Sequence, residues 1–81
     1  DITKTVAGLK TAGLMNNGQA CVAQTRILVS RHRHDELVDA LADMMSSLNV
    51  GDPTDDKTDI GPLVAQRQQR RVQAYIRSGV E

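Results

Sequence analysis

The chain has 81 residues, and its ten Lys and Arg residues balance ten Asp and Glu residues, so the formal net charge is zero. This balance gives no reason to expect a nucleic-acid partner, and no apolar run reaches the ~18 residues that a membrane span requires. With Tyr75 as the only aromatic residue, the chain forms one domain at most and has little material for a core.

The two ends of the chain favour a piece of a longer protein over a complete small helical domain. The sequence begins with Asp1 and opens directly into a helical pattern, and it stops at Glu81 with no terminator after Gly79. Its single cysteine provides no disulfide framework, which fits a reducing compartment and predicts a cytoplasmic protein.

The first predicted element is a helix from about Ile2 to Met15, in which apolar residues recur at helical spacing. Asp1 and Thr3 can serve at its start as caps or as charge that complements the helix dipole. Gly13 lowers helix propensity by about 1 kcal/mol relative to Ala, so we expect another stretch of backbone to come close to it. Asn16-Asn17-Gly18 should end the helix, because Asn and Gly tolerate left-handed backbone conformations.

A strand is predicted next, from Thr25 to Ser30. Its centre, Ile27-Leu28-Val29, is apolar on both faces, which is typical of a buried strand in a parallel α/β sheet. The sequence contains no second convincing strand, so the sheet partners are expected elsewhere in a longer chain.

Two more helices are predicted after this strand. An amphipathic helix runs from about His32 to Leu48. A loop rich in Asp, Thr, Gly and Pro follows from Asp52 to Pro62, and a last helix with one apolar face runs from about Val64 to Ser78. The order helix, strand, helix, loop, helix indicates part of an α/β domain.

The chemically distinctive residue is Cys21, which the sequence places on a turn between the first helix and the strand. A reactive cysteine attacks as the thiolate and needs a lowered pKa or a neighbouring base. No Lys, Arg or His lies within four residues of Cys21, and the preceding helix C-terminus disfavours a thiolate. The residues alone therefore also support a second hypothesis, a small helical interaction module in which Cys21 is a buried structural residue.

No cluster of side chains predicts a metal site. His32 and His34 lie two residues apart and diverge by roughly 200° on a helix, and no third ligand stands at a suitable spacing for zinc. The Asp residues between positions 52 and 59 lack the spacing of a calcium loop, so a solvated loop is expected there.

Several short motifs, taken in order, resemble the NAD(P)-dependent aldehyde dehydrogenase family. The run Asn16-Asn17-Gly18-Gln19-Ala20-Cys21 is similar to the family pattern Asn-x-Gly-Gln-x-Cys, and Arg26 opens the apolar segment that follows. The remaining motifs are Asp35-Glu36-Leu37, Val50-Gly51-Asp52-Pro53, Asp59-Ile60-Gly61-Pro62-Leu63 and a Gln- and Arg-rich helix ending in Tyr75-Ile76. Each motif alone is weak, but in this order they cover essentially the whole chain and are specific.

The resemblance implies that Cys21 is the catalytic nucleophile of an aldehyde dehydrogenase. Its thiolate would add to an aldehyde to give a thiohemiacetal, hydride transfer to the nicotinamide would leave a thioester, and water would release the carboxylic acid. The backbone N–H of Cys21 would contribute to the oxyanion site. Ala20, Val22 and Met15 would line the substrate channel. Leu14-Met15 stands where many members carry an aromatic residue, so no particular aldehyde is favoured.

The resemblance also implies that residues 1–81 are a partial catalytic domain of a longer dehydrogenase. NAD or NADP would be bound mainly by parts of the parent chain outside these residues. The general-base Glu and the oxyanion Asn of the family would lie there as well. The expected partners are a small-molecule aldehyde and further copies of the parent chain in a homo-oligomer, and the isolated 81 residues are expected to be inactive.

Overall fold

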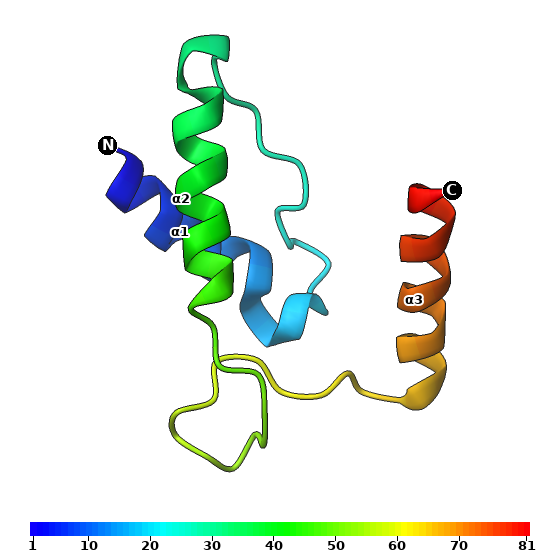
Figure 1. Ribbon diagram of the computed structural model, residues 1–81. Helices are drawn as coiled ribbons and strands as arrows, with labels where there is room; N and C mark the ends of the chain where they lie inside the picture. The colour runs from blue at the N-terminus through cyan, green and yellow to red at the C-terminus, as the bar shows by residue number, and fades with distance from the viewer.

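The computed structural model describes residues 1–81 as three α-helices joined by extended segments and tight turns (Figure 1). The elements are α1 (Ile2–Leu14), η1 (Met15–Gly18), η2 (Arg31–Arg33), α2 (His34–Ser46) and α3 (Gln66–Val80), where η marks a short 3₁₀ helix. The helices α1 and α2 cross each other, whereas α3 stands apart at the end of an extended segment. The three predicted helices are present, and each end lies within two residues of its predicted position.

The helix α1 begins and ends where its local side chains predict. The carboxylate of Asp1 accepts a hydrogen bond from the backbone N–H of Lys4 at 3.2 Å, which satisfies one of the free donors at the helix start. Asn16, Asn17 and Gly18 have φ values of 53°, 59° and 77°, so a left-handed turn follows the helix. The predicted cap and the predicted helix end are both confirmed.

After this turn the chain comes back to the C-terminal end of α1. The backbone N–H of Gln24 donates to the carbonyl oxygen of Ala12 at 3.0 Å. A Cβ atom at Gly13 would lie only 3.3 Å from the carbonyl oxygen of Gln24. The expected close approach of another backbone to Gly13 is therefore confirmed, and the returning segment is the one that carries Cys21.

The contact between α1 and α2 contains the small core of the chain. Leu37 of α2 is the one buried residue, with 4% of its surface exposed. Leu9 of α1 and Leu41 and Met44 of α2 line a common apolar pocket of about 330 Å³. This pocket is open to solvent, so apolar side chains at the contact between α1 and α2 stay partly exposed.

The strand predicted from Thr25 to Ser30 is absent. These residues have no β partner, and Leu28 is 91% exposed. The one β pairing in the chain is an isolated parallel bridge between Val50 and Ile60. A strand needs a neighbour for its N–H and C=O groups, and no other segment of the chain supplies one. The predicted order helix, strand, helix, loop, helix is therefore not confirmed at its second element, and no sheet supports the α/β class within these residues.

The loop between α2 and α3 is closed by hydrogen bonds across its base. The backbone N–H groups of Asp59 and Ile60 both donate to the carbonyl oxygen of Asn49, at 2.8 and 3.0 Å. Inside the loop, Asp52 and Asp55 each accept a hydrogen bond from the backbone N–H two residues further along, which forms two tight turns. The loop is exposed, as predicted, but it has a defined shape.

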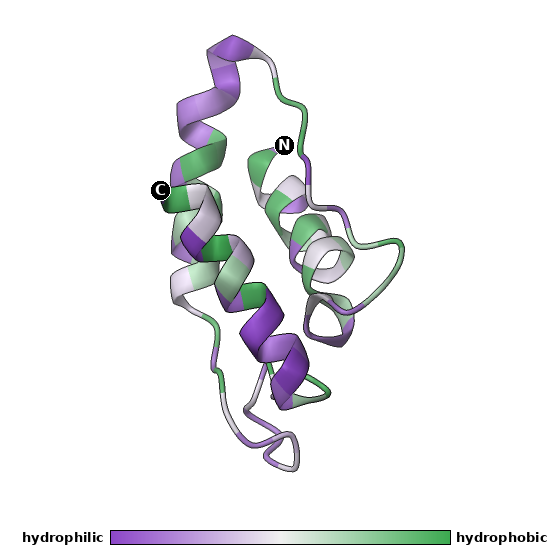
Figure 2. Cartoon of the chain, turned by 90° about the vertical axis from the view of Figure 1, so that its right-hand side faces the viewer, coloured by the Kyte–Doolittle hydropathy of each residue, from purple (hydrophilic) through white to green (hydrophobic).

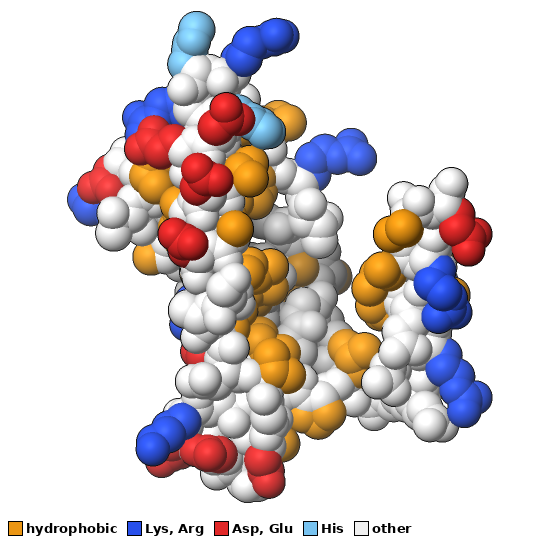
Figure 3. All heavy atoms as spheres, viewed as in Figure 1, with side chains coloured by type: hydrophobic (Ala, Val, Ile, Leu, Met, Phe, Trp, Pro, Cys, Tyr) orange, Lys and Arg blue, Asp and Glu red, His pale blue; other side chains and the backbone are white.

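The helix α3 packs against no other helix. Hydrophobic and hydrophilic residues occupy different parts of α3 (Figure 2). The hydrophobic side chains of α3 gather on the edge that faces α1 and α2 (Figure 3). Val72, Tyr75 and Ile76 are 44%, 69% and 62% exposed. The radius of gyration is 14.2 Å, against about 12 Å for a compact domain of this length. The chain is therefore open, with an uncovered apolar face. None of its helices has the length and apolar character needed to cross a membrane.

The two glycines inside α1 should respond differently to Ala. No atom lies within 4 Å of a Cβ built on Gly8, whereas a Cβ on Gly13 would press on the Gln24 carbonyl. In the full-length protein, Gly8→Ala should therefore raise the free energy of unfolding by about 0.5–1 kcal/mol through helix propensity. Gly13→Ala should gain less or lose stability. Denaturant unfolding of both variants measures this, and an equal gain would contradict the close approach seen at Gly13.

Candidate functional site

Cys21 lies at the tip of a turn and is exposed to solvent. The turn spans residues 20–23 and is closed by a hydrogen bond from the backbone N–H of Ala23 to the carbonyl oxygen of Ala20 at 3.0 Å. No acceptor in the chain takes a hydrogen bond from the backbone N–H of Cys21. Cys21 is therefore exposed, and its backbone N–H has no partner within the chain. The hypothesis of a buried structural cysteine is wrong on the point of burial.

Hydrogen bonds hold the chain on both sides of this turn. On the C-terminal side, Gln24 is bonded to α1 through the carbonyl oxygen of Ala12. On the N-terminal side, the backbone N–H and the side-chain amide of Gln19 both donate to the carbonyl oxygen of Asn16, at 3.0 and 3.3 Å. The side-chain amide of Asn16 donates in return to the carbonyl oxygen of Gln19 at 3.2 Å. Cys21 thus lies at the tip of a short turn, and hydrogen bonds hold the chain just before and just after this turn.

A second set of hydrogen bonds joins this region to a distant part of the chain. The side-chain oxygen of Asn17 accepts from the backbone N–H of Gly61 at 2.9 Å, and its amide nitrogen donates to the carbonyl oxygen of Pro62 at 3.1 Å. The side-chain oxygen of Gln19 accepts from the backbone N–H of Val64 at 3.0 Å. We refer to these three hydrogen bonds as the turn–loop contacts. They connect residues that are 44 and 45 positions apart in the sequence.

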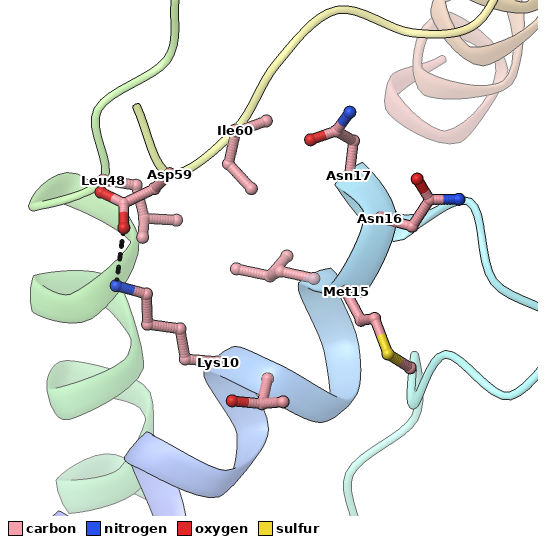
Figure 4. Close-up of a pocket in the computed structure, with 9 residues that line it drawn as sticks. Lys10, Met15, Asn16, Asn17, Leu48, Asp59 and Ile60 are labelled. Carbon is pink, nitrogen blue, oxygen red and sulfur yellow. Dashed lines mark hydrogen bonds and ion pairs between the residues drawn. The ribbon is translucent and has the colours of Figure 1, made fainter. Parts of the chain in front are cut away.

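A pocket of about 210 Å³ lies next to the turn–loop contacts, between η1, the end of α1 and the start of the loop (Figure 4). Leu14, Met15 and Ile60 are among its apolar lining residues. Its polar side carries the ion pair between Lys10 Nζ and an Asp59 carboxylate oxygen, 3.0 Å apart. The pocket therefore combines an apolar wall with one charge pair.

The structure brings only part of the predicted substrate channel together. Met15 lines the pocket, whereas Ala20, Cys21 and Val22 lie outside it. Ala20 is half-buried, and Val22 is 68% exposed beside the thiol. A channel that leads to Cys21 is not formed by these three residues and Met15 alone.

The structure gathers no group of three or more His, Cys, Asp or Glu side chains around a common point. His34 pairs instead with its neighbour, because its Nδ1 lies 2.8 Å from a carboxylate oxygen of Asp35. His32 and His34 thus belong to an exposed helix entrance.

Two carboxylates in the loop are stabilised in their charged form. The backbone N–H of Asn49 donates to Asp59 at 3.0 Å, and this hydrogen bond, followed by that from Lys10, lowers the pKa of Asp59 below its ordinary value of 3.8. The backbone N–H and the hydroxyl of Thr54 lower the pKa of Asp52 in the same way. Asp59 is therefore the residue that joins the loop to α1.

Sequence reasoning missed the contacts of Asn17, Gln19 and Asp59. The Asn-rich run predicted a helix end, and it gave no sign that two of its side chains reach a segment more than forty residues away. The spacing between Lys10 and Asp59 carries no local signal either. Only the order of the motifs in the sequence linked the cysteine run with Asp59-Ile60-Gly61-Pro62.

Comparison with known families defines the class of this protein. The model of the aldehyde dehydrogenase family matches residues 1–81. The chain therefore belongs to the aldehyde dehydrogenase family, as the ordered motifs predict. No solved structure matches the chain.

Individual relatives within the family carry more specific names. The chain is 40% identical over 79 residues to a geranial dehydrogenase of Castellaniella defragrans, covering 98% of this chain and 16% of the relative. It is 42% identical over 66 residues to an NADP(+)-dependent succinate-semialdehyde dehydrogenase of Mycobacterium avium, covering 82% of this chain and 14% of the relative. It is 38% identical over 76 residues to an NADP(+)-dependent succinate-semialdehyde dehydrogenase of Mycobacterium ulcerans, covering 94% of this chain and 17% of the relative. The chain spans about a sixth of the length of these curated relatives.

The charged state of Asp59 gives a testable prediction. In the folded protein the pKa of Asp59 should lie below 3.8, and Lys10→Met should leave it below 3.8 because the Asn49 N–H is the larger cause. Since the pKa is lowered in the folded state, the stabilisation is present above the unfolded value of about 3.9 and is lost as the pH falls through the folded pKa. A carboxyl-carbon NMR titration measures this, and an Asp59 pKa at or above 3.8 would contradict it.

Proposed function

We propose that residues 1–81 are the cysteine-bearing part of the catalytic domain of an NAD(P)-dependent aldehyde dehydrogenase. In this proposal the whole protein is a cytoplasmic homo-oligomer that oxidises an aldehyde to a carboxylic acid. The observation that supports it best is the geometry at Cys21. Its thiol is exposed at the tip of a turn, and hydrogen bonds hold the chain on both sides of that turn. The chain's membership of the family gives this geometry its chemical meaning.

In the proposed reaction, Cys21 acts as the nucleophile. Its thiolate sulfur attacks the aldehyde carbon to form a thiohemiacetal, and the negative charge develops on the former carbonyl oxygen. The backbone N–H of Cys21, which has no acceptor in this chain, is available to donate a hydrogen bond to that oxygen. A donor that is already in place stabilises the charge without reorganisation during the reaction.

A nicotinamide cofactor, when bound by other parts of the protein, would supply the hydride acceptor for oxidation of the thiohemiacetal. Cys21 would then hold the acyl group as a thioester, and hydrolysis of the thioester by water would release the acid and restore the thiol. The tip position of Cys21 suits this sequence, because both an aldehyde and a water molecule need access to the same sulfur atom.

The residues of this chain do not by themselves form a dinucleotide site. No helix begins directly after a glycine-rich turn, which is the arrangement that places backbone N–H groups around a pyrophosphate. The starts of α1 and α2 carry Asp1, Asp35 and Glu36, whose negative charge opposes phosphate binding. Binding of NAD or NADP is therefore assigned to other parts of the parent protein. The names of the mycobacterial relatives support NADP for those relatives.

The substrate is proposed only as a class, a small-molecule aldehyde. The relatives are named for geranial and for succinate semialdehyde, so their names favour no single substrate for this chain. Met15 borders the pocket and is 46% exposed, which offers a flexible, non-aromatic wall. Met15 and the residues beside the thiol, Ala20 and Val22, remain our candidates for the channel.

One observation favours the alternative, a helical interaction module. The apolar face of α3 is uncovered, and a face of this kind is typical of a docking surface. We favour the dehydrogenase because the family match covers residues 1–81, and the rest of a catalytic domain would cover the same face.

The proposal predicts the effect of Cys21→Ser in the full-length protein. Aldehyde-dependent NAD(P)H formation should fall to background, because a serine hydroxyl ionises far less readily than a thiol and is a much weaker nucleophile, while the melting temperature and cofactor binding stay within error. Ser30→Ala, an exposed change in the following segment, serves as the control and should keep full activity. Wild-type turnover in Cys21→Ser would show that Cys21 is not the nucleophile.

A second prediction separates the dehydrogenase segment from the interaction module. With Leu37 as its one buried residue, the isolated chain of 81 residues should show no cooperative melting transition and no dehydrogenase activity. Circular dichroism against temperature measures the first property. A sharp, reversible transition would favour a self-sufficient module instead.

A further inference from the structure

We propose that Asn17 is a positioning residue for Cys21, and that it acts through its two hydrogen bonds to Gly61 and Pro62. This inference rests on the proposed role of Cys21 as the nucleophile. The family pattern Asn-x-Gly-Gln-x-Cys leaves the second position open, so Asn17 is a feature of this chain and not of the pattern.

The side chain of Asn17 is fixed at both of its polar atoms. Its oxygen accepts from Gly61 and its nitrogen donates to Pro62, so one amide group satisfies a backbone donor and the next backbone acceptor in the same segment. Asp would keep the acceptor and place a second oxygen against the Pro62 carbonyl, and Ser is too short to span both groups. Asn is also one of the few residues that tolerate the φ of 59° found at this position.

The turn–loop contacts restrict the backbone that leads to the cysteine. Asn17 and Gln19 lie four and two residues before Cys21, and both are bonded to the segment 61–64. On the other side of Cys21, Gln24 is bonded to α1. If the segment 61–64 is released, residues 16–19 lose all their side-chain hydrogen bonds to the distant loop and keep only those to neighbouring residues. The direction of the thiol and of the Cys21 N–H then becomes less well defined.

Figure 4 shows the same arrangement from the pocket side. The side chain of Asn17 points toward the segment that follows Ile60, and that of Asn16 points away from the pocket. The two neighbouring asparagines therefore have different roles. Asn16 closes the local turn with Gln19, and Asn17 joins that turn to the rest of the chain.

The test uses the full-length dehydrogenase and two ways of removing the turn–loop contacts. Asn17→Gly keeps the left-handed backbone and removes the amide, and Gln19→Met keeps the side-chain length and removes the acceptor for Val64. Asn49→Ala is the matched control, because the Asn49 amide also donates to a backbone carbonyl, that of Lys57, at 3.1 Å but does not touch the cysteine turn.

Steady-state kinetics give kcat and the KM values for the aldehyde and the cofactor for each variant. The pH profile of alkylation of Cys21 by iodoacetamide is followed by peptide mass spectrometry. The melting temperature of each variant is measured as well. We expect Asn17→Gly and Gln19→Met each to lower kcat about tenfold and to change the alkylation rate of Cys21 severalfold, with the cofactor KM unchanged. The double variant should lose little more than either single variant, because both changes release the same segment. Asn49→Ala should match the wild type in kcat and alkylation.

The proposal requires both kcat and the alkylation rate to change in the Asn17 and Gln19 variants and not in Asn49→Ala. It is overturned if Asn17→Gly keeps either value within about twofold of wild type, or if its lost activity returns fully at a temperature where the variant is folded, since that result indicates a purely structural role. Cys21→Ser with wild-type turnover would instead overturn the proposed function itself, so the two failures are distinguishable.

Discussion

The site depends on a run of three residues with left-handed backbone conformation. Asn16, Asn17 and Gly18 all have positive φ, and L-residues adopt this conformation singly far more readily than in succession. Such a run persists only where surrounding contacts determine it. Here the side chains of Asn16 and Asn17 provide those contacts, one to Gln19 and one to Gly61 and Pro62. The same backbone reversal that ends α1 places Cys21 on its exposed turn.

The rest of the 81 residues leaves much of its apolar surface exposed. The apolar face of α3, the loose contact of α1 with α2, and the unpaired segment from Thr25 to Ser30 all leave apolar surface exposed. Each of these apolar surfaces is available to pack against another element. Hydrogen bonds in contrast hold the chain on both sides of Cys21, so this turn is better defined than the core between α1 and α2.

Local features of the fold could be read from the sequence, and non-local ones could not. The cap at Asp1, the helix end at Asn16 and the close approach at Gly13 each follow from the conformational preferences of a few neighbouring residues. The strand predicted at Thr25 is not confirmed, because an apolar run forms a strand only beside a partner strand and these residues contain none. The contacts of Asn17 were invisible because no periodicity connects positions so far apart. The family was evident from ordered motifs, whereas the exposure of Cys21 needed the structure.

The long sequence separation of the turn–loop contacts also affects how the site is made during synthesis. Cys21 leaves the ribosome before Gly61, Pro62 and Val64, the residues that fix its turn, have been added to the chain. At roughly 5–20 residues per second, this interval is on the order of seconds. For that time Cys21 lies in a nascent chain whose turn has only its local hydrogen bonds. The turn–loop contacts can therefore form only after the loop that follows α2 has been translated.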